Sequence, residues 1–222
     1  MRSGREPRRR QKPKVFHASI KRLAALAYAA MNTRNPYVTR SRREVYDNAW
    51  IRVIEHTIQK PRGGEGIYGV VHFKNRAVGV VPYAGGMVWL VGQHRFPLDL
   101  YSWEIPEGGA PEHEALEDCA RRELAEETGL HAGSLEHLFS MHLSNSVSDE
   151  IAHVYLATEL REGKVRWEDT EELAVRKVSV DELLRAVLAG AITDSMTVAA
   201  AFRLKLLQLE GRLSAAPMPA EP

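Results

Sequence analysis

The chain has 222 residues, 44% of them hydrophobic, and a formal net charge of +1. That length is sufficient for one sizeable hydrophobic core with a small appendage. The single cysteine, Cys119, excludes an internal disulfide framework, and no apolar run reaches the roughly 18 residues of a membrane-spanning helix. Disulfide-rich secreted proteins and helical membrane proteins are therefore excluded, and we expect a cytoplasmic protein.

The charge is distributed unevenly. Residues 1–43 contain 13 of the 30 Lys and Arg residues and one acidic residue, whereas the rest of the chain has 17 basic and 28 acidic residues. We expect residues 1–43 to be a basic extension, partly disordered, with a short amphipathic helix over Ser19–Asn32. A contact with nucleic acid or an anionic membrane, or a transit segment, is one interpretation; a solubilising tail or an upstream start codon is favoured. We expect a folded domain over residues 44–213 and a disordered tail over residues 214–222.

The rest of the chain alternates between short strands and helices. Ser179 and Glu182 form a capping box for a helix through Leu188, and Asp194 can cap a final helix that runs to Gly211. This pattern predicts an α/β fold with a mixed sheet between helices. Runs of β-branched and aromatic residues predict strands at Val45–Ile58 (one long strand or a pair), Gly66–Phe73, Ala77–Tyr83, Met87–Gln93, Glu150–Leu160 and Leu173–Val180.

One stretch predicts a helix with glycines at both ends: GGAPEHEALEDCARRELAEETGL, Gly108–Leu130. Pro111 fits the first turn, where its missing N–H does no harm. Gly129 can adopt the left-handed conformation that ends a helix.

Two carboxylates of this helix point into its apolar stripe. At about 100° per residue, Glu123 and Glu127 fall within about 20° of Leu116, in the middle of the stripe. Buried carboxylates are costly unless they are paired or bind a cation, so this position favours a metal site over a solvated Glu-rich helix. Glu126 can pair with Arg122, which would hold it near the site. Because no His or Cys cluster accompanies them, the expected ion is Mg²⁺, with Mn²⁺ as the alternative.

Gly108, Glu114 and the run RELAEETGL (Arg122–Leu130) resemble a complete Nudix box. WEIPEGG (Trp103–Gly109) and GQHRFP (Gly92–Pro97) are similar to the branch of that family that hydrolyses ADP-ribose and nucleoside-diphosphate sugars. The resemblance implies the Nudix α/β/α sandwich, with its mixed β-sheet between helices.

The resemblance also implies roles for single residues. The box carboxylates bind the metal, together with a backbone carbonyl near the start of the box, for which Glu107 is the candidate. Glu114 pairs with Arg122 and orders the helix. The expected metal site is therefore Glu107, Glu123, Glu126 and Glu127, and the structural box positions are Gly108, Glu114, Arg122 and Gly129.

The resemblance places the general base on a glutamate of a late loop. The corresponding loop here is RWEDTEELAV (Arg166–Val175), and its register points to Glu171, with Glu172 and Glu168 as rivals. The candidate catalytic residues are therefore Glu171, Glu123 and Glu127.

Substrate contacts are predicted from residue type. Arg95 can bind a phosphate in bidentate fashion, although a surface ion pair is an equal alternative. Trp50 and Tyr68 are candidates for stacking on a base, or else belong to the core or to an interface. Because N-terminal strands of this branch often cross to a partner, the resemblance implies a homodimer. The proline typical of ADP-ribose-selective relatives is missing from LSNSVSDE (Leu143–Glu150).

We therefore expect Mg²⁺-dependent hydrolysis of a nucleoside-diphosphate sugar, GDP-mannose-like or ADP-ribose-like, to a nucleoside monophosphate and a sugar phosphate. One alternative is an RNA-binding protein that removes a 5′ pyrophosphate and would show salt-sensitive RNA binding. The other is a non-catalytic ligand sensor, which would be expected to lose box carboxylates.

Overall fold

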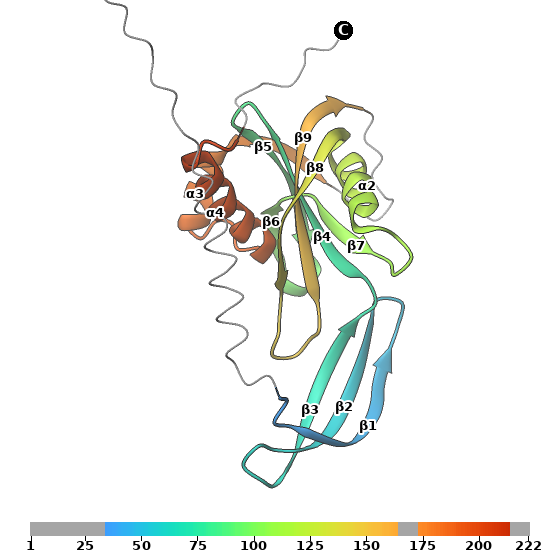
Figure 1. The fold of residues 1–222 in the computed structure, drawn as a ribbon. Coiled ribbons are helices and arrows are strands. Elements are labelled where there is room, and N and C mark those ends of the chain that lie inside the picture. Colours follow the sequence, from blue (N-terminus) through green and yellow to red (C-terminus); the bar gives the residue numbers. More distant parts are fainter. Residues whose placement is uncertain (1–33, 164–172, 214–222) are drawn as a thin grey trace, which may run out of the picture.

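A computed structural model describes residues 34–163 and 173–213 (Figure 1). A small N-terminal sheet projects from a larger mixed sheet that carries helices on both faces. The small sheet is antiparallel and has the order β1 (Val38–Asp47), β2 (Ile51–Gln59), β3 (Glu65–Phe73).

The larger sheet has the strand order β10–β5–β4–β9–β8, in which β4 and β9 run parallel and the other neighbours antiparallel. Two short strands extend it, because β6 pairs with β5 and β7 pairs with β4. Its strands are β4 (Arg76–Ala84), β5 (Met87–Arg95), β6 (Leu100–Glu104), β7 (Glu107–Ala110), β8 (Leu130–His142), β9 (Ile151–Glu162) and β10 (Ala174–Ser179). A short 3-10 helix, η1 (Phe96–Leu98), connects β5 to β6.

Helix α2 (Leu116–Thr128) packs on one face of this sheet, and α3 (Val180–Leu188) and α4 (Ser195–Leu209) pack on the other. The sheet has a hydrophobic core on each face, and successive residues of the central strand β4 point alternately into the two cores. Val80 belongs to the core under α2, whereas Val81 belongs to the core under α3 and α4, and both are fully buried. This is why β4 is a nearly continuous apolar run, and it confirms the predicted mixed sheet between helices.

The boundaries of several elements differ from the sequence analysis. The strand β1 begins at Val38, inside the range assigned to the N-terminal extension, and its exposed arginines suit an edge strand. Pro111 is not in a helix, so that expectation was wrong. Residues 107–110 pair with β4 as β7, the amide of Glu114 donates to the carbonyl of Pro111 in a turn, and α2 starts only at Leu116.

The predicted helix ends are confirmed elsewhere. Gly129 ends α2 with φ 72°. Ser179 and Glu182 form the capping box of α3, and the Asp194 side chain caps α4 by accepting from the amide of Thr197 at 2.7 Å. Within the described residues no helix is long and apolar enough to cross a membrane. The expected helix over Ser19–Asn32 and the tail over 214–222 lie outside the described residues.

The small sheet is attached to the large one by the β8–β9 loop. The amide of Val71 in β3 donates to the carbonyl of Val147 at 2.8 Å, and Val71 forms a parallel bridge with Ser148. The Tyr68 hydroxyl donates to the carbonyl of Ser146 at 2.7 Å. These bonds hold β3 beside the large sheet and close one side of a cleft.

Candidate active site

A cleft of about 710 Å³ lies where the two sheets meet. The small sheet and the turns at its ends contribute aromatic side chains, while β7, α2 and the start of α4 contribute charged ones. The lining includes Trp50, Phe73, Arg95, Glu107, Gly108, Glu123, Glu126, Glu150 and Asp194.

Helix α2 directs its carboxylates toward the strand β7. Glu127 is 2% exposed, and its Oε2 accepts a hydrogen bond from the backbone amide of Glu107 at 3.0 Å. The side chains of Glu123 and Glu126 are 12% and 31% exposed. The structure thus places Glu127 and Glu123 inward and Glu126 at the rim of the cleft.

Gly108 is needed because the helix and β7 approach so closely. A Cβ atom built on Gly108 would overlap the carboxylate of Glu123. Any other residue here would force the carboxylate or the strand to move.

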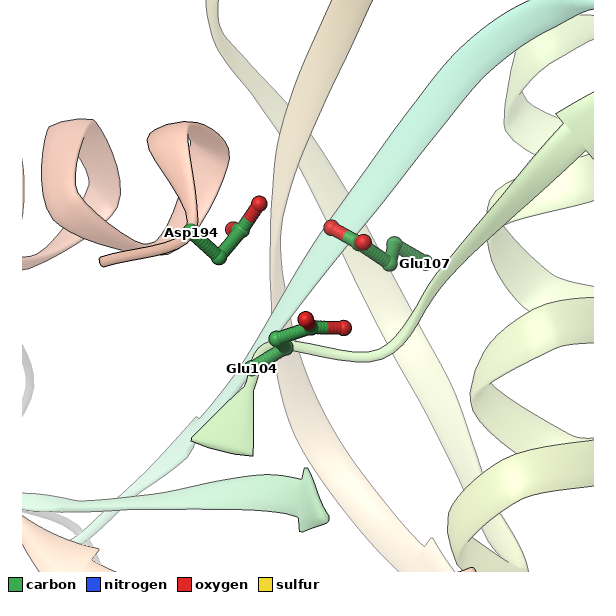
Figure 2. A group of neighbouring side chains, drawn as sticks. All are labelled: Glu104, Glu107 and Asp194. Atoms are coloured by element: carbon green, nitrogen blue, oxygen red, sulfur yellow. The ribbon is translucent and has the colours of Figure 1, made fainter. Parts of the chain in front are cut away.

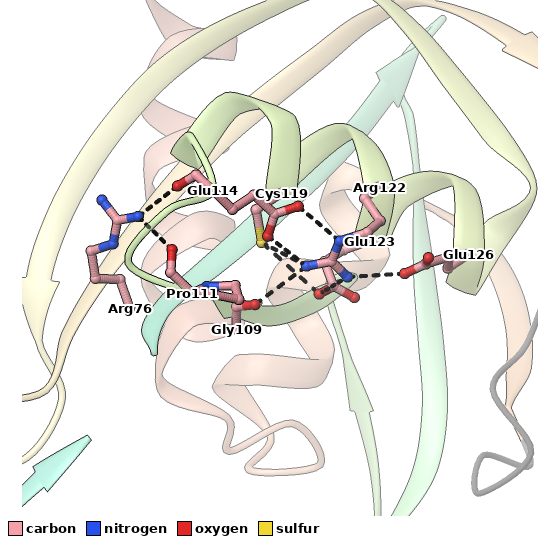
Figure 3. Close-up of polar contacts among 8 residues, drawn as sticks. All are labelled: Arg76, Gly109, Pro111, Glu114, Cys119, Arg122, Glu123 and Glu126. Carbon is pink, nitrogen blue, oxygen red and sulfur yellow. Dashed lines mark hydrogen bonds and ion pairs between the residues drawn. The ribbon is translucent and has the colours of Figure 1, made fainter. Parts of the chain in front are cut away.

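Arg122 is the hub of the polar contacts on this side of the cleft (Figure 3). Its Nε and Nη2 donate to the two carboxylate oxygens of Glu114, both at 2.9 Å. Its Nη1 donates to Glu123 at 2.7 Å and to Glu126 at 3.0 Å. The hydrogen bonds to Glu114, which outweigh burial, raise the pKa of Arg122, and the same pairing lowers the pKa of Glu114. A permanent cation therefore orients two carboxylates of the cleft.

A second acidic cluster lies beside the first, with Glu107 between them. One carboxylate oxygen from each of Glu104, Glu107 and Asp194 lies within 4.8 Å of the others (Figure 2). Arg95 neutralises part of this charge: its Nε donates to both oxygens of Glu104, at 3.1 and 3.0 Å, and its Nη2 contacts Glu107 at 2.5 Å. Burial disfavours the charge of Arg95, but the bonds to Glu104 and the nearby carboxylates outweigh it, so its pKa is raised. Burial, followed by the charges of Asp194 and Glu104, raises the pKa of Glu107 well above its ordinary value.

The sequence analysis found only part of this cluster. It gave Arg95 two equal interpretations, a phosphate clamp and an ion pair, and the structure places Arg95 in the cleft with its guanidinium paired to two carboxylates. Glu104 and Asp194 were missed as site residues, although Asp194 was expected as a helix cap. The one available signal was Glu104 inside the quoted WEIPEGG run; nothing in the sequence places Asp194 near it.

Of the three other predicted site residues, one lines the cleft, one lies elsewhere and one is outside the described residues. Trp50 lines the cleft and is 70% exposed. Tyr68 does not join it, and lies in a smaller depression of the small sheet with Tyr37 and His56. Glu171 lies outside the described residues. Glu150, at the end of the β8–β9 loop, lines the cleft, and burial followed by the charge of Asp149 raises its pKa.

Comparison with known families agrees with this geometry. Residues 73–197, which hold the large sheet and the start of α4, match the NUDIX domain. The chain belongs to the Nudix family. Residues 38–71, which cover nearly all of the small sheet, match the nucleoside diphosphate sugar hydrolase N-terminal domain. The family prediction from the box is therefore confirmed.

Named Nudix relatives include enzymes that act on pyrophosphate bonds. The chain is 29% identical over 179 residues to an ADP-ribose pyrophosphatase of Bacillus subtilis (strain 168), covering 80% of this chain and 95% of the relative. It is 29% identical over 138 residues to a GDP-mannose pyrophosphatase of Yersinia enterocolitica, covering 58% and 70% of the two chains. A crystal structure of an ADP compounds hydrolase superposes with a TM-score of 0.73 at 18% identity, over 82% of this chain and all of that one. This last likeness confirms the α/β Nudix fold.

The cleft residues fit the divalent cation that Nudix hydrolases generally use. Five carboxylate side chains line the cleft: Glu107, Glu123, Glu126, Glu150 and Asp194. Carboxylate oxygens are the ligands that Mg²⁺ and Mn²⁺ prefer.

Proposed function

We propose that this Nudix protein hydrolyses the pyrophosphate linkage of a nucleoside-diphosphate sugar, giving a nucleoside monophosphate and a sugar phosphate, with Mg²⁺ or Mn²⁺ as cofactor. One observation carries the proposal: α2 directs Glu123 and Glu126 into the cleft, where Gly108 allows close approach, and the buried Glu127 lies directly behind them on the amide of Glu107. A divalent cation bound there would supply Lewis-acid chemistry, neutralising pyrophosphate charge and acidifying water.

The residues of the chain have three tasks in this reaction. Glu123, Glu126 and Glu127, with the backbone carbonyl of Glu107, would hold the cation. Arg122 fixes two of these carboxylates through its bonds from Nη1. Water attacks one phosphorus atom, a phosphoanhydride P–O bond breaks, and the water proton passes to a general base.

Glu171 is our proposed general base. Its place in the sequence, just before the strand β10, supports it, because β10 pairs with β5 and β5 leads to Arg95 in the cleft. Glu150 is the next candidate, since it lines the cleft and its raised pKa makes it a stronger base than an ordinary glutamate.

The substrate class follows from the shape of the cleft and from the relatives. A cleft of about 710 Å³ has room for a dinucleotide-sized ligand, and Trp50 offers an exposed ring for a base. Both ADP-ribose and GDP-mannose pyrophosphatases are among the relatives. We favour a GDP-mannose-like compound over ADP-ribose because the loop Leu143–Glu150 lacks the proline expected for ADP-ribose selectivity.

A panel of nucleoside-diphosphate sugars tests the proposal. Each compound is incubated with the full chain and Mg²⁺, and phosphate is measured after treatment with a phosphatase that acts only on the products. Release from GDP-mannose or ADP-ribose, abolished by EDTA and restored by Mg²⁺, is expected. Release from none of the sugars, but from 5′-triphosphorylated RNA, would replace this substrate class with the RNA alternative.

We further propose that the protein is a cytoplasmic homodimer that pairs through the small sheet. Every residue of β1 is exposed, and so are several large apolar side chains of this sheet and its turns. Exposed apolar side chains that gather on one small sheet mark a candidate interface. These exposed apolar side chains are Tyr37, Val38, Val45, Tyr46, Trp50, Ile67, Tyr68 and Phe73.

Light scattering tests the dimer. The molar mass of the full chain is compared with that of a β1 charge variant, Val45→Glu, which shows whether the dimer depends on this sheet.

A further inference from the structure

We propose that Glu104, Glu107 and Asp194 form a cation site of their own, outside the Nudix box, that binds a divalent cation with oxygen ligands. Its part in catalysis rests on the proposed function, but the existence of the site does not. The box site uses the Glu107 backbone carbonyl, whereas the new site uses the Glu107 side chain.

The spacing of the three carboxylates suits such an ion. One oxygen from each lies within 4.8 Å of the others. Two oxygens bound to one ion at about 2.0–2.6 Å, the range from Mg²⁺ to Ca²⁺, are at most about 4.0–5.2 Å apart. The three side chains converge on one point from β6, β7 and the start of α4 (Figure 2), so a small contraction would complete the contacts.

A buried oxygen without a partner points to a missing ligand. Only 11% of the Glu107 side chain is exposed, and its Oε2 is fully buried with no hydrogen-bond partner in the described part of the chain. The Glu107 carboxylate is directed toward Asp194 (Figure 2). An unsatisfied buried carboxylate oxygen is costly unless a proton or a cation meets it.

The charge of the cluster favours a divalent ion. Three carboxylates face one guanidinium, that of Arg95, which contacts Glu104 and Glu107. Two negative charges are left in a largely buried setting, since only 4% of the Glu104 side chain is exposed. A divalent cation would neutralise them, whereas a single proton would leave one charge.

The cluster is also held in place by its surroundings. The Asp194 oxygen Oδ2 caps α4 by accepting from the amide of Thr197, which leaves its other oxygen for the cluster. The fully buried hydroxyl of Thr197 accepts from the amide of Ile105 at 2.9 Å, which ties the residue after Glu104 to α4. Ligands fixed in this way lose little freedom when an ion binds.

Counting bound Mn²⁺ tests the site without any substrate. The full chain is titrated with Mn²⁺, and free ion is measured by electron paramagnetic resonance, for the unaltered protein, Glu107→Gln and Asp194→Asn. Both substitutions change only a carboxylate to an amide of the same shape, and Asn at position 194 can still cap α4. Each should lose one bound Mn²⁺, or bind it at least about 10-fold more weakly, while the box ion remains.

Two controls separate this site from the box and from a general change in charge. Glu123→Gln should remove the box ion and leave the ion of the new site. Glu150→Gln removes a carboxylate of the same cleft from outside the cluster and should leave the Mn²⁺ count unchanged. Circular dichroism verifies that each variant is folded.

The outcomes are distinct. If Glu107→Gln and Asp194→Asn bind as many Mn²⁺ ions as the unaltered protein, with equal affinity, the cluster holds only a proton and the inference is wrong. If both lose an ion but no nucleoside-diphosphate sugar is hydrolysed, the site stands and the proposed function fails.

Discussion

Arg122 donates two parallel hydrogen bonds to Glu114, from Nε to Oε1 and from Nη2 to Oε2, both 2.9 Å long. The remaining nitrogen, Nη1, serves Glu123 and Glu126. Because Glu114 precedes α2, this pair fixes the guanidinium from outside the helix while it orients two carboxylates inside the cleft. Bidentate pairs of this kind are both strong and geometrically specific.

Replacing Arg122 by Lys should therefore weaken metal binding although the charge is kept. Lysine cannot form the planar fork to Glu114 and reach Glu123 and Glu126 together. The loss of a residue that orients metal ligands typically costs about 10–100-fold in metal affinity, which Mn²⁺ titration would measure. Arg212→Lys, on a half-exposed arginine near Glu136 and Glu210, is the matched control and should bind Mn²⁺ normally.

The contact between Gly108 and Glu123 gives a second prediction. An alanine at Gly108 would press its methyl group into the Glu123 carboxylate and displace a proposed metal ligand. A misplacement of about 1 Å can cost about 10²-fold in rate, so kcat should fall by that order in a steady-state assay. Gly69→Ala is the control, because a Cβ on Gly69 meets no atom within 4 Å. Equal rates for both variants would contradict the importance of this close approach.

The box carboxylates give a third prediction. Glu123→Gln and Glu127→Gln should each lower kcat by at least about 10²-fold, because each loses a charged ligand. Denaturant unfolding should show that both variants still fold cooperatively. Activity close to normal in both variants would rule out the metal assignment.

The sequence predicted those features whose residues lie close together in the chain. The box helix carries its carboxylates at fixed spacing, so the inward direction of Glu127 follows from 3.6 residues per turn. The caps Gly129 and Asp194 are local signals of the same kind. Each depends on a few neighbouring residues, and the structure confirms each.

The features that the sequence did not predict depend on contacts between residues far apart in the chain. Asp194 reaches Glu107 only because α4 packs on the sheet beside β7, and a capping residue gives no sign of what its second oxygen faces. The guanidinium of Arg95 turns to Glu104 because β5 and β6 are paired neighbours. The start of α2 was misplaced because pairing of β7 with β4 overrides the helical tendency of the residues around Pro111.

The capping box of α3 gives a prediction on pH. Hydrogen bonds from the Ser179 amide and hydroxyl to the Glu182 carboxylate, at 2.8 and 2.7 Å, lower the pKa of Glu182 below its ordinary value of 4.5. The folded protein therefore holds this proton less tightly than the unfolded chain. The stabilisation is fully present above pH 4.5 and is lost as the pH falls through the lowered pKa.

Glu182→Gln should accordingly lower the urea midpoint at pH 7 more than it does at pH 3. The measurement is the difference in midpoint between the unaltered protein and the variant at each pH. A difference that is the same at both values would show that the charge of Glu182 contributes nothing to the cap.

The general base is the most demanding prediction. Glu171→Gln should reduce kcat by about 10²–10⁴-fold with little change in KM, because a base acts on water and not on the sugar. It should also leave Mn²⁺ affinity closer to normal than Glu127→Gln does. Glu168→Gln and Glu172→Gln are the controls, since a general loss of negative charge would affect all three neighbouring glutamates alike. If one of the controls is the most damaging, the base is that neighbour. If none matters, Glu150→Gln becomes the decisive variant, because Glu150 lines the cleft and burial already raises its pKa.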